Sequence, residues 1–152
     1  MLIGKAVRYA LIASGALVSF SVAAAPADII TTRQQGLKQM GKAFKAISDN
    51  LKATPDVGLI RTNAAVIAMQ APKVGGWFPK GSGKEVGVKT GALPTIWQQR
   101  AEFDADSKKL ADAAKAFSAA ATKGNVDEIK ASAGALGQTC KGCHQTFRER
   151  ES

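Results

Sequence analysis

Two cysteines and one histidine stand close together near the end of the chain, at Cys140, Cys143 and His144, and the 152 residues contain no other cysteine or histidine. A spacing of i, i+3 and i+4 places all three side chains on one face of a helix. Two thiols beside an imidazole can bond the two vinyl groups of a porphyrin and reach its iron, and C-x-x-C-H is the attachment signature of c-type haem. The motif predicts one covalent haem c on Cys140 and Cys143, with His144 as the axial ligand of the iron.

Three other kinds of site that use paired cysteines fit the sequence less well. A structural zinc site needs a fourth ligand, which no remaining Cys or His supplies. A thioredoxin-like redox pair would begin a helix, where the helix dipole lowers the thiol pKa, whereas these cysteines lie in the last turns of a predicted helix. A disulfide between positions i and i+3 of a helix has poor geometry.

The composition narrows the class of protein. A chain of 152 residues with 45% apolar and 22% charged residues fits one globular domain, which excludes a large multidomain enzyme. Lys and Arg number 21 against 12 acidic residues, a net charge of +9, but they are scattered and not interleaved with aromatic residues, which argues against nucleic-acid binding. No carboxylate pair, Ser-His arrangement or second metal cluster is visible, so we do not expect an enzyme.

The first 25 residues are typical of a secretory signal peptide. Lys5 and Arg8 precede an apolar run from Tyr9 to Val22, and three alanines follow at 23–25. The run of about 14 residues is shorter than the roughly 20 that cross a bilayer. We predict cleavage within one or two residues of Ala25, export to the bacterial periplasm, and a mature domain over 26–152 without a membrane span.

Four stretches of the mature region repeat apolar residues at spacings of three and four, which predicts amphipathic helices. Caps, prolines and glycines set their limits: from Asp28 to before Pro55, from Asp56 to Gln70, from Pro94 to Gly124, and from an Asn125/Glu128 capping box through Phe147. A loop too rich in Gly and Pro for regular structure joins the second and third helices. The pattern predicts an all-α fold, an antiparallel four-helix bundle with the haem on its C-terminal helix.

The second axial position of the iron is left open by the residue types. Because His144 is the only histidine, the mature chain offers Met40 and Met69 as thioether ligands, or no ligand at all. Met40 lies on the apolar stripe of the first helix, where a methionine more often fills the core. Met69 lies at the end of the second helix and is the weaker candidate.

The whole mature region resembles the class II cytochromes c, and within them cytochrome c′. The run of residues 140–148, Cys-Lys-Gly-Cys-His-Gln-Thr-Phe-Arg, is similar to the family's C-x-x-C-H-x-x-(aromatic)-Arg ending, whereas class I cytochromes carry the motif near the N-terminus. Arg33-Gln34, Phe78-Pro79 followed by Gly-Ser-Gly, and the stretch Pro94-Thr-Ile-Trp97 support the resemblance.

The resemblance implies roles for five further residues. Arg33, with Gln34 beside it, would lie near the haem propionates, and Leu37 would pack against the distal face of the haem. Low-spin members of the class have a methionine where this chain has Leu37, which carries no donor atom, so the resemblance favours a five-coordinate iron. Met40, one turn further along, remains the alternative sixth ligand. Arg148 would lie beside the proximal face, near His144.

Two functions follow as expectations from the haem and from the resemblance. One is electron transfer with protein redox partners, for which two axial ligands are an advantage because a filled site changes little on oxidation. The other is binding of nitric oxide or carbon monoxide, which needs a vacant position. The resemblance also implies a homodimer formed through the first two helices.

Overall fold

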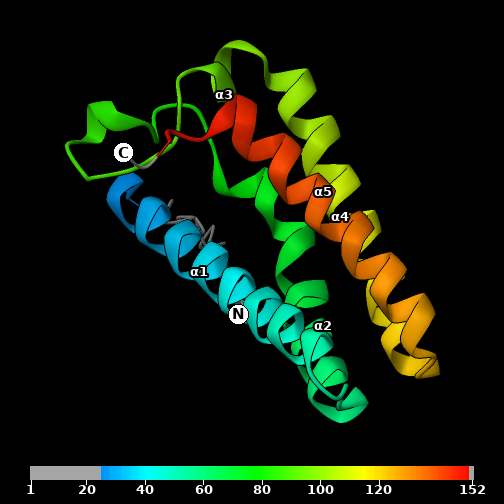
Figure 1. The fold of residues 1–152 in the computed structure, drawn as a ribbon. Helices are drawn as coiled ribbons and strands as arrows, with labels where there is room; N and C mark the ends of the chain where they lie inside the picture. Colours follow the sequence, from blue (N-terminus) through cyan, green and yellow to red (C-terminus); the bar gives the residue numbers. More distant parts are fainter. Residues whose placement is uncertain (1–24, 151–152) are drawn as a thin grey trace, which may run out of the picture.

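The computed structural model describes residues 25–150. Figure 1 shows four long helices joined by one extended loop region. The elements, in chain order, are α1 (Pro26–Lys52), α2 (Val57–Gln70), the 3₁₀ segments η1 (Ala71–Trp77) and η2 (Lys84–Val86), the short α3 (Thr95–Gln98), α4 (Arg100–Lys123) and α5 (Val126–Phe147). The four-helix bundle expected from the sequence is confirmed. Except for Ala25, the predicted signal peptide lies outside the described residues.

Several helix ends lie where the sequence predicts them. The Asp56 carboxylate accepts hydrogen bonds from the backbone N–H groups of Gly58 (2.8 Å) and Leu59 (3.1 Å) and thereby caps α2. The Asn125 side chain caps α5 in the same way. Gly124 ends α4 with a φ of 82°, a left-handed conformation that favours glycine.

Other helix boundaries differ from the prediction. The first helix begins at Pro26 rather than at Asp28, because the carbonyl of Ala25 already accepts from the N–H groups of Asp28 and Ile29. Asp28 therefore lies in the first turn, where its negative charge interacts favourably with the helix dipole and stabilises the helix. The third predicted helix is broken at Gln99, with φ −115° and ψ 47°, so that Pro94 precedes only the short α3.

The loop predicted to lack regular structure contains the two 3₁₀ segments. Short 3₁₀ turns tolerate Pro in their first turn, as at Pro72, and need few consecutive residues. Arg100, the first residue of α4, donates to the carbonyls of Phe78 (2.6 Å) and Gly75 (2.9 Å). These bonds attach the η1 region to α4 and depend on the break at Gln99.

The helices pack in the order α1 on α2, α2 on α4 and α4 on α5. The segment from Gly91 onward closes one end of the bundle over the last turn of α5: Leu93 N–H donates to the Phe147 carbonyl (3.1 Å) and the Gly91 carbonyl accepts from Glu149 N–H (2.8 Å). Within residues 25–150, no helix combines the length and apolarity that a membrane span requires. The C-terminal end of α5 is therefore hydrogen-bonded to the segment that begins at Gly91.

Phe103 packs between two other aromatic rings, and replacing its side chain should destabilise the fold. Its ring is 2% exposed and meets the rings of Phe78 and Phe147 edge to face, at centroid distances of 5.0 and 5.3 Å. We expect Phe103→Ala to lower the free energy of unfolding by about 3 to 5 kcal/mol, because it leaves a cavity between two other rings. Denaturant unfolding measures the change, and Leu59→Ala at an exposed position is the control, expected within about 0.5 kcal/mol of the parent.

Candidate haem-binding site

The two cysteines lie on α5 as free thiols, half-buried against the core. Burial raises the pKa of Cys140, and burial together with the negative charge of Asp106 raises the pKa of Cys143 to about 11. Reactive cysteines of redox enzymes have lowered pKa values. The structure therefore argues against a thioredoxin-like pair, and it leaves both sulfur atoms available for thioether bonds.

His144 follows on the next residue of the same helix, with an exposed side chain. Partial desolvation by its surroundings lowers the pKa of the imidazole, and the positive charge of Arg148 lowers it further. Arg148 is the C-cap residue of α5 and its backbone N–H donates to the His144 carbonyl (3.3 Å). The predicted proximity of Arg148 to His144 is thus present in the structure.

A contact between α1 and α5 relates the positions of Leu37 and His144 along the bundle. The two helices run in opposite directions (Figure 1), and a Cβ built on Gly137 would lie 3.2 Å from Cζ of Phe44. Leu37 is two turns before Phe44 on α1, and His144 is two turns after Gly137 on α5. Because the helices are antiparallel, these steps lead toward the same end of the bundle.

The three candidate distal residues differ in their surroundings. Leu37 is half-buried at the edge of the core. Met40 is 8% exposed and belongs to the buried core cluster, as a core-filling methionine does. Met69 is 58% exposed, which is poor shielding for an iron ligand. Of the three, Leu37 is the one that is half-buried at the edge of the core, neither enclosed in it nor largely exposed.

Arg33 is the most deeply buried charged residue of α1, with 1% of its surface exposed. Its guanidinium donates to the hydroxyls of Ser82 (3.0 Å) and Thr90 (2.9 Å) and lies 4.6 Å from the ring centroid of Phe78. Burial lowers its pKa, partly offset by the charge of Glu85. Among the described residues, no carboxylate forms an ion pair with it within 4.0 Å, so a buried positive charge lacks its direct counter-ion.

The side chain of Gln34 does not share the hydrogen-bond partners of Arg33. Its side-chain amide is exposed and donates to the carbonyl of Lys89 at 2.7 Å, which attaches the loop before Gly91 to α1. The structure therefore brings Cys140, Cys143 and His144 together on α5. It also brings Arg33 and Leu37 together on α1, and it places Gln34 on the loop side.

Comparison with known proteins decides the family. The sequence model of the family described as Cytochrome C′ matches residues 28–148 of this chain. The chain belongs to the cytochrome c′ family. The resemblance found in the sequence is thereby confirmed, and with it the covalent haem c that the family carries.

Individual cytochromes c′ match the chain over nearly their full length. The cytochrome c′ of Pararhodospirillum photometricum is 40% identical over 128 residues, which are 83% of this chain and 100% of that protein. A solved cytochrome c′ with a ligand-controlled dimer dissociation superposes with a TM-score of 0.81 at 29% identity, covering 85% of this chain and 100% of the other. The nitric oxide complex of a mutant cytochrome c′ from Alcaligenes xylosoxidans has a TM-score of 0.73 at 28% identity, covering 82% and 97%.

The residues of this cytochrome c′ fit the haem c of the family. Two free thiols and an imidazole share one face of α5, as thioether attachment and axial ligation require. The buried guanidinium of Arg33 lacks a bonded carboxylate, which a haem propionate has the charge to supply. The donor set on α5 and the buried charge of Arg33, which has no ion pair within 4.0 Å among the described residues, therefore suit such a group.

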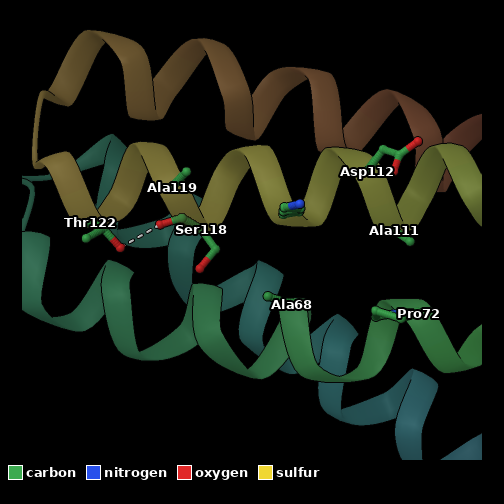
Figure 2. A pocket seen from close by; sticks show the side chains of 8 residues that line it. Ala68, Pro72, Ala111, Asp112, Ser118, Ala119 and Thr122 are labelled. Atoms are coloured by element: carbon green, nitrogen blue, oxygen red, sulfur yellow. Dashed lines mark hydrogen bonds between the residues drawn. The ribbon is translucent and has the colours of Figure 1, made fainter.

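One surface groove lies away from the predicted haem site. It has a volume of about 540 Å³ and lies between α4 and the segment formed by α2 and the start of η1. Figure 2 shows the residues that line it: Ala68, Pro72, Ala111, Asp112, Lys115, Ser118, Ala119 and Thr122. None of the predicted haem-site residues lines it. A smaller cavity of about 250 Å³ between α4 and α5 includes Cys143 and Asp106.

Two contacts of this cytochrome c′ were not predicted from the sequence. Gly36 on α1 lies against the ring of Trp77, and Gly137 on α5 lies against the ring of Phe44. The sequence carried no signal that singled them out, since α1 also contains Gly41 and α5 also contains Gly134 and Gly142, where a Cβ would meet no atom within 4 Å. Both contacts set how closely α1 approaches its neighbours.

Proposed function

We propose that this protein is an exported, periplasmic cytochrome c′ with a five-coordinate haem iron that transfers electrons and binds nitric oxide or carbon monoxide. Bound haem c supplies one-electron chemistry and one open coordination position. The observation that carries the proposal is the difference between the two candidates on α1: Leu37 is half-buried at the edge of the core, whereas Met40 is packed inside it. A leucine side chain has no donor atom, so it shields that position without filling it.

The chain's own residues have distinct tasks in this proposal. Cys140 and Cys143 anchor the haem to α5, and His144 is its only protein ligand. Arg33 pairs with a propionate, which balances its buried charge. Leu37 excludes water from the distal side, while Arg148 acts on the imidazole of His144 through its charge.

Partners follow from the same site. A mutant of the matching Alcaligenes xylosoxidans protein forms a nitric oxide complex, which supports a small diatomic ligand here. The solved relative with ligand-controlled dimer dissociation supports a homodimer, which we place at α1 and α2. Redox partner proteins would donate or accept the electron. The proposed export depends on residues 1–25, of which only Ala25 is described.

Absorption spectra of the ferric and ferrous protein, with and without carbon monoxide, test the proposed function. We expect a largely high-spin ferric protein whose ferrous form binds carbon monoxide. Leu37→Ala should speed that binding, because it removes the side chain that blocks the distal side. Met40→Leu should leave the spectra unchanged and cost under about 1.5 kcal/mol of stability, since the two side chains have similar volumes.

The alternative function gives the opposite pattern. If Met40 is the sixth ligand of a plain electron carrier, the parent is low-spin and Met40→Leu converts it to high-spin. That result would overturn the five-coordinate proposal. A parent that is high-spin and unaffected by Met40→Leu supports it.

A further inference from the structure

Gly36 makes the closest glycine contact of the described chain. A Cβ built at this position would lie 2.2, 2.7 and 2.9 Å from Cη2, Cζ2 and Cζ3 of Trp77, distances that real Cβ atoms do not show. The outer edge of the indole ring therefore lies directly on the backbone of α1. Only glycine allows that approach, because any other residue would place a methyl group inside the ring.

Trp77 itself is held on a fixed segment. It is the last residue of η1, and the carbonyls of Gly75 and Phe78 on either side of it accept hydrogen bonds from Arg100 at 2.9 and 2.6 Å. Arg100 in turn forms an ion pair with Asp104 at 2.9 Å. The backbone on either side of the ring is therefore bonded to α4, which limits how far this segment can move away from α1.

The next residue of the loop contacts α1 one turn earlier. The Phe78 ring lies 4.6 Å from the guanidinium carbon of Arg33, as Trp77 lies against Gly36. Two consecutive aromatic residues thus support the α1 turn from Arg33 to Leu37. Because Leu37 directly follows Gly36, any shift of the backbone at Gly36 moves Leu37 with it.

We infer that the contact between Gly36 and Trp77 is a positioning device that fixes Leu37 on the distal side and so controls how readily a diatomic ligand reaches the iron. This inference rests on the proposed function. Gly36 and Trp77 act only through Leu37 and are positioning residues. An extra methyl group at position 36 forces α1 away from the ring and displaces Leu37 from its blocking position.

Carbon monoxide binding to the ferrous holoprotein tests the inference. We expect Gly36→Ala to raise the association rate by about tenfold, as an overpacked contact of this severity displaces the backbone. Gly41→Ala is the matched control, because it lies on the same helix and a Cβ there has no atom within 4 Å. That control should bind carbon monoxide at the parent's rate.

A double-mutant cycle connects the effect to the indole ring. Trp77→Leu removes the three ring carbons that the new methyl would meet and should itself raise the rate, because α1 loses its support. Adding Gly36→Ala to Trp77→Leu should then change the rate by less than about twofold, since coupled residues are not additive. Unfolding of the same four holoproteins should show the same coupling between positions 36 and 77.

The outcomes separate this inference from the proposed function. A parent that binds no carbon monoxide overturns the proposed function and the role of the contact together. A parent that binds it, with Gly36→Ala at the parent's rate or with an equal effect of Gly36→Ala on the Trp77→Leu background, overturns the inference alone. If Gly36→Ala does not fold, Trp77→Leu decides, and a parent-like rate in that variant overturns it.

Discussion

Replacing both Cys140 and Cys143 by serine is expected to yield a protein from which acidified acetone extracts all the haem, while the parent keeps its colour in the protein fraction. The physical reason is that a serine hydroxyl does not form the thioether bond by which each sulfur holds the porphyrin. Each single replacement leaves one thioether, so Cys140→Ser and Cys143→Ser should each retain the colour. The measurement is the visible absorbance of the precipitated protein and of the solvent.

Lys141→Ser is the matched control for the cysteine variants. Lys141 lies between the two cysteines in the same turn of α5 and its side chain is exposed, so the change introduces serine without removing a thiol. Its haem should remain with the protein. Loss of colour from the parent to the solvent would show that the haem is not covalently attached and would remove the assignment of both cysteines.

The sequence predicts the parts of the fold that depend on local chemistry. Asp56, Asn125 and Gly124 act through hydrogen bonds or backbone conformation within a few residues. Asp56 and Asn125 begin α2 and α5, and Gly124 ends α4, where expected. The break at Gln99 was missed, because the bonds that accompany it run from Arg100 to carbonyls 22 and 25 residues away. A break stabilised by distant partners leaves no local pattern.

In the candidate site, too, local spacing was predictable from the sequence, whereas contacts with distant residues were not. The spacing of Cys140, Cys143 and His144 fixes their common face as soon as the segment is helical. The burial of Arg33 was not predictable from residue types, since its hydroxyl partners Ser82 and Thr90 lie 49 and 57 residues further along the chain. Its role beside the haem propionates stays a prediction from the family resemblance, and what the structure adds is a buried charge without a bonded carboxylate.

His144→Ala is expected to remove the protein ligand of the iron while both thioethers keep the haem attached. The chain has one histidine, so no second imidazole can replace it. Both the ferric and the ferrous absorption spectra should change strongly, and the colour should still stay with the protein in acidified acetone. Added imidazole should restore much of the parent spectrum, because His144 is exposed on α5 and its removal leaves a site that a small molecule can enter.

Gln145→Ala is the control for this variant, since Gln145 is the exposed neighbour of His144 on the same helix. Its spectra should match the parent's, which separates loss of the ligand from a general disturbance of the last turn of α5. If His144→Ala kept the parent's ferrous spectrum and iron coordination, the axial assignment would be wrong. The ligand would then have to be another side chain, such as the thioether of Met40 on α1, and the assignment of an open coordination position beside Leu37 would fall with it.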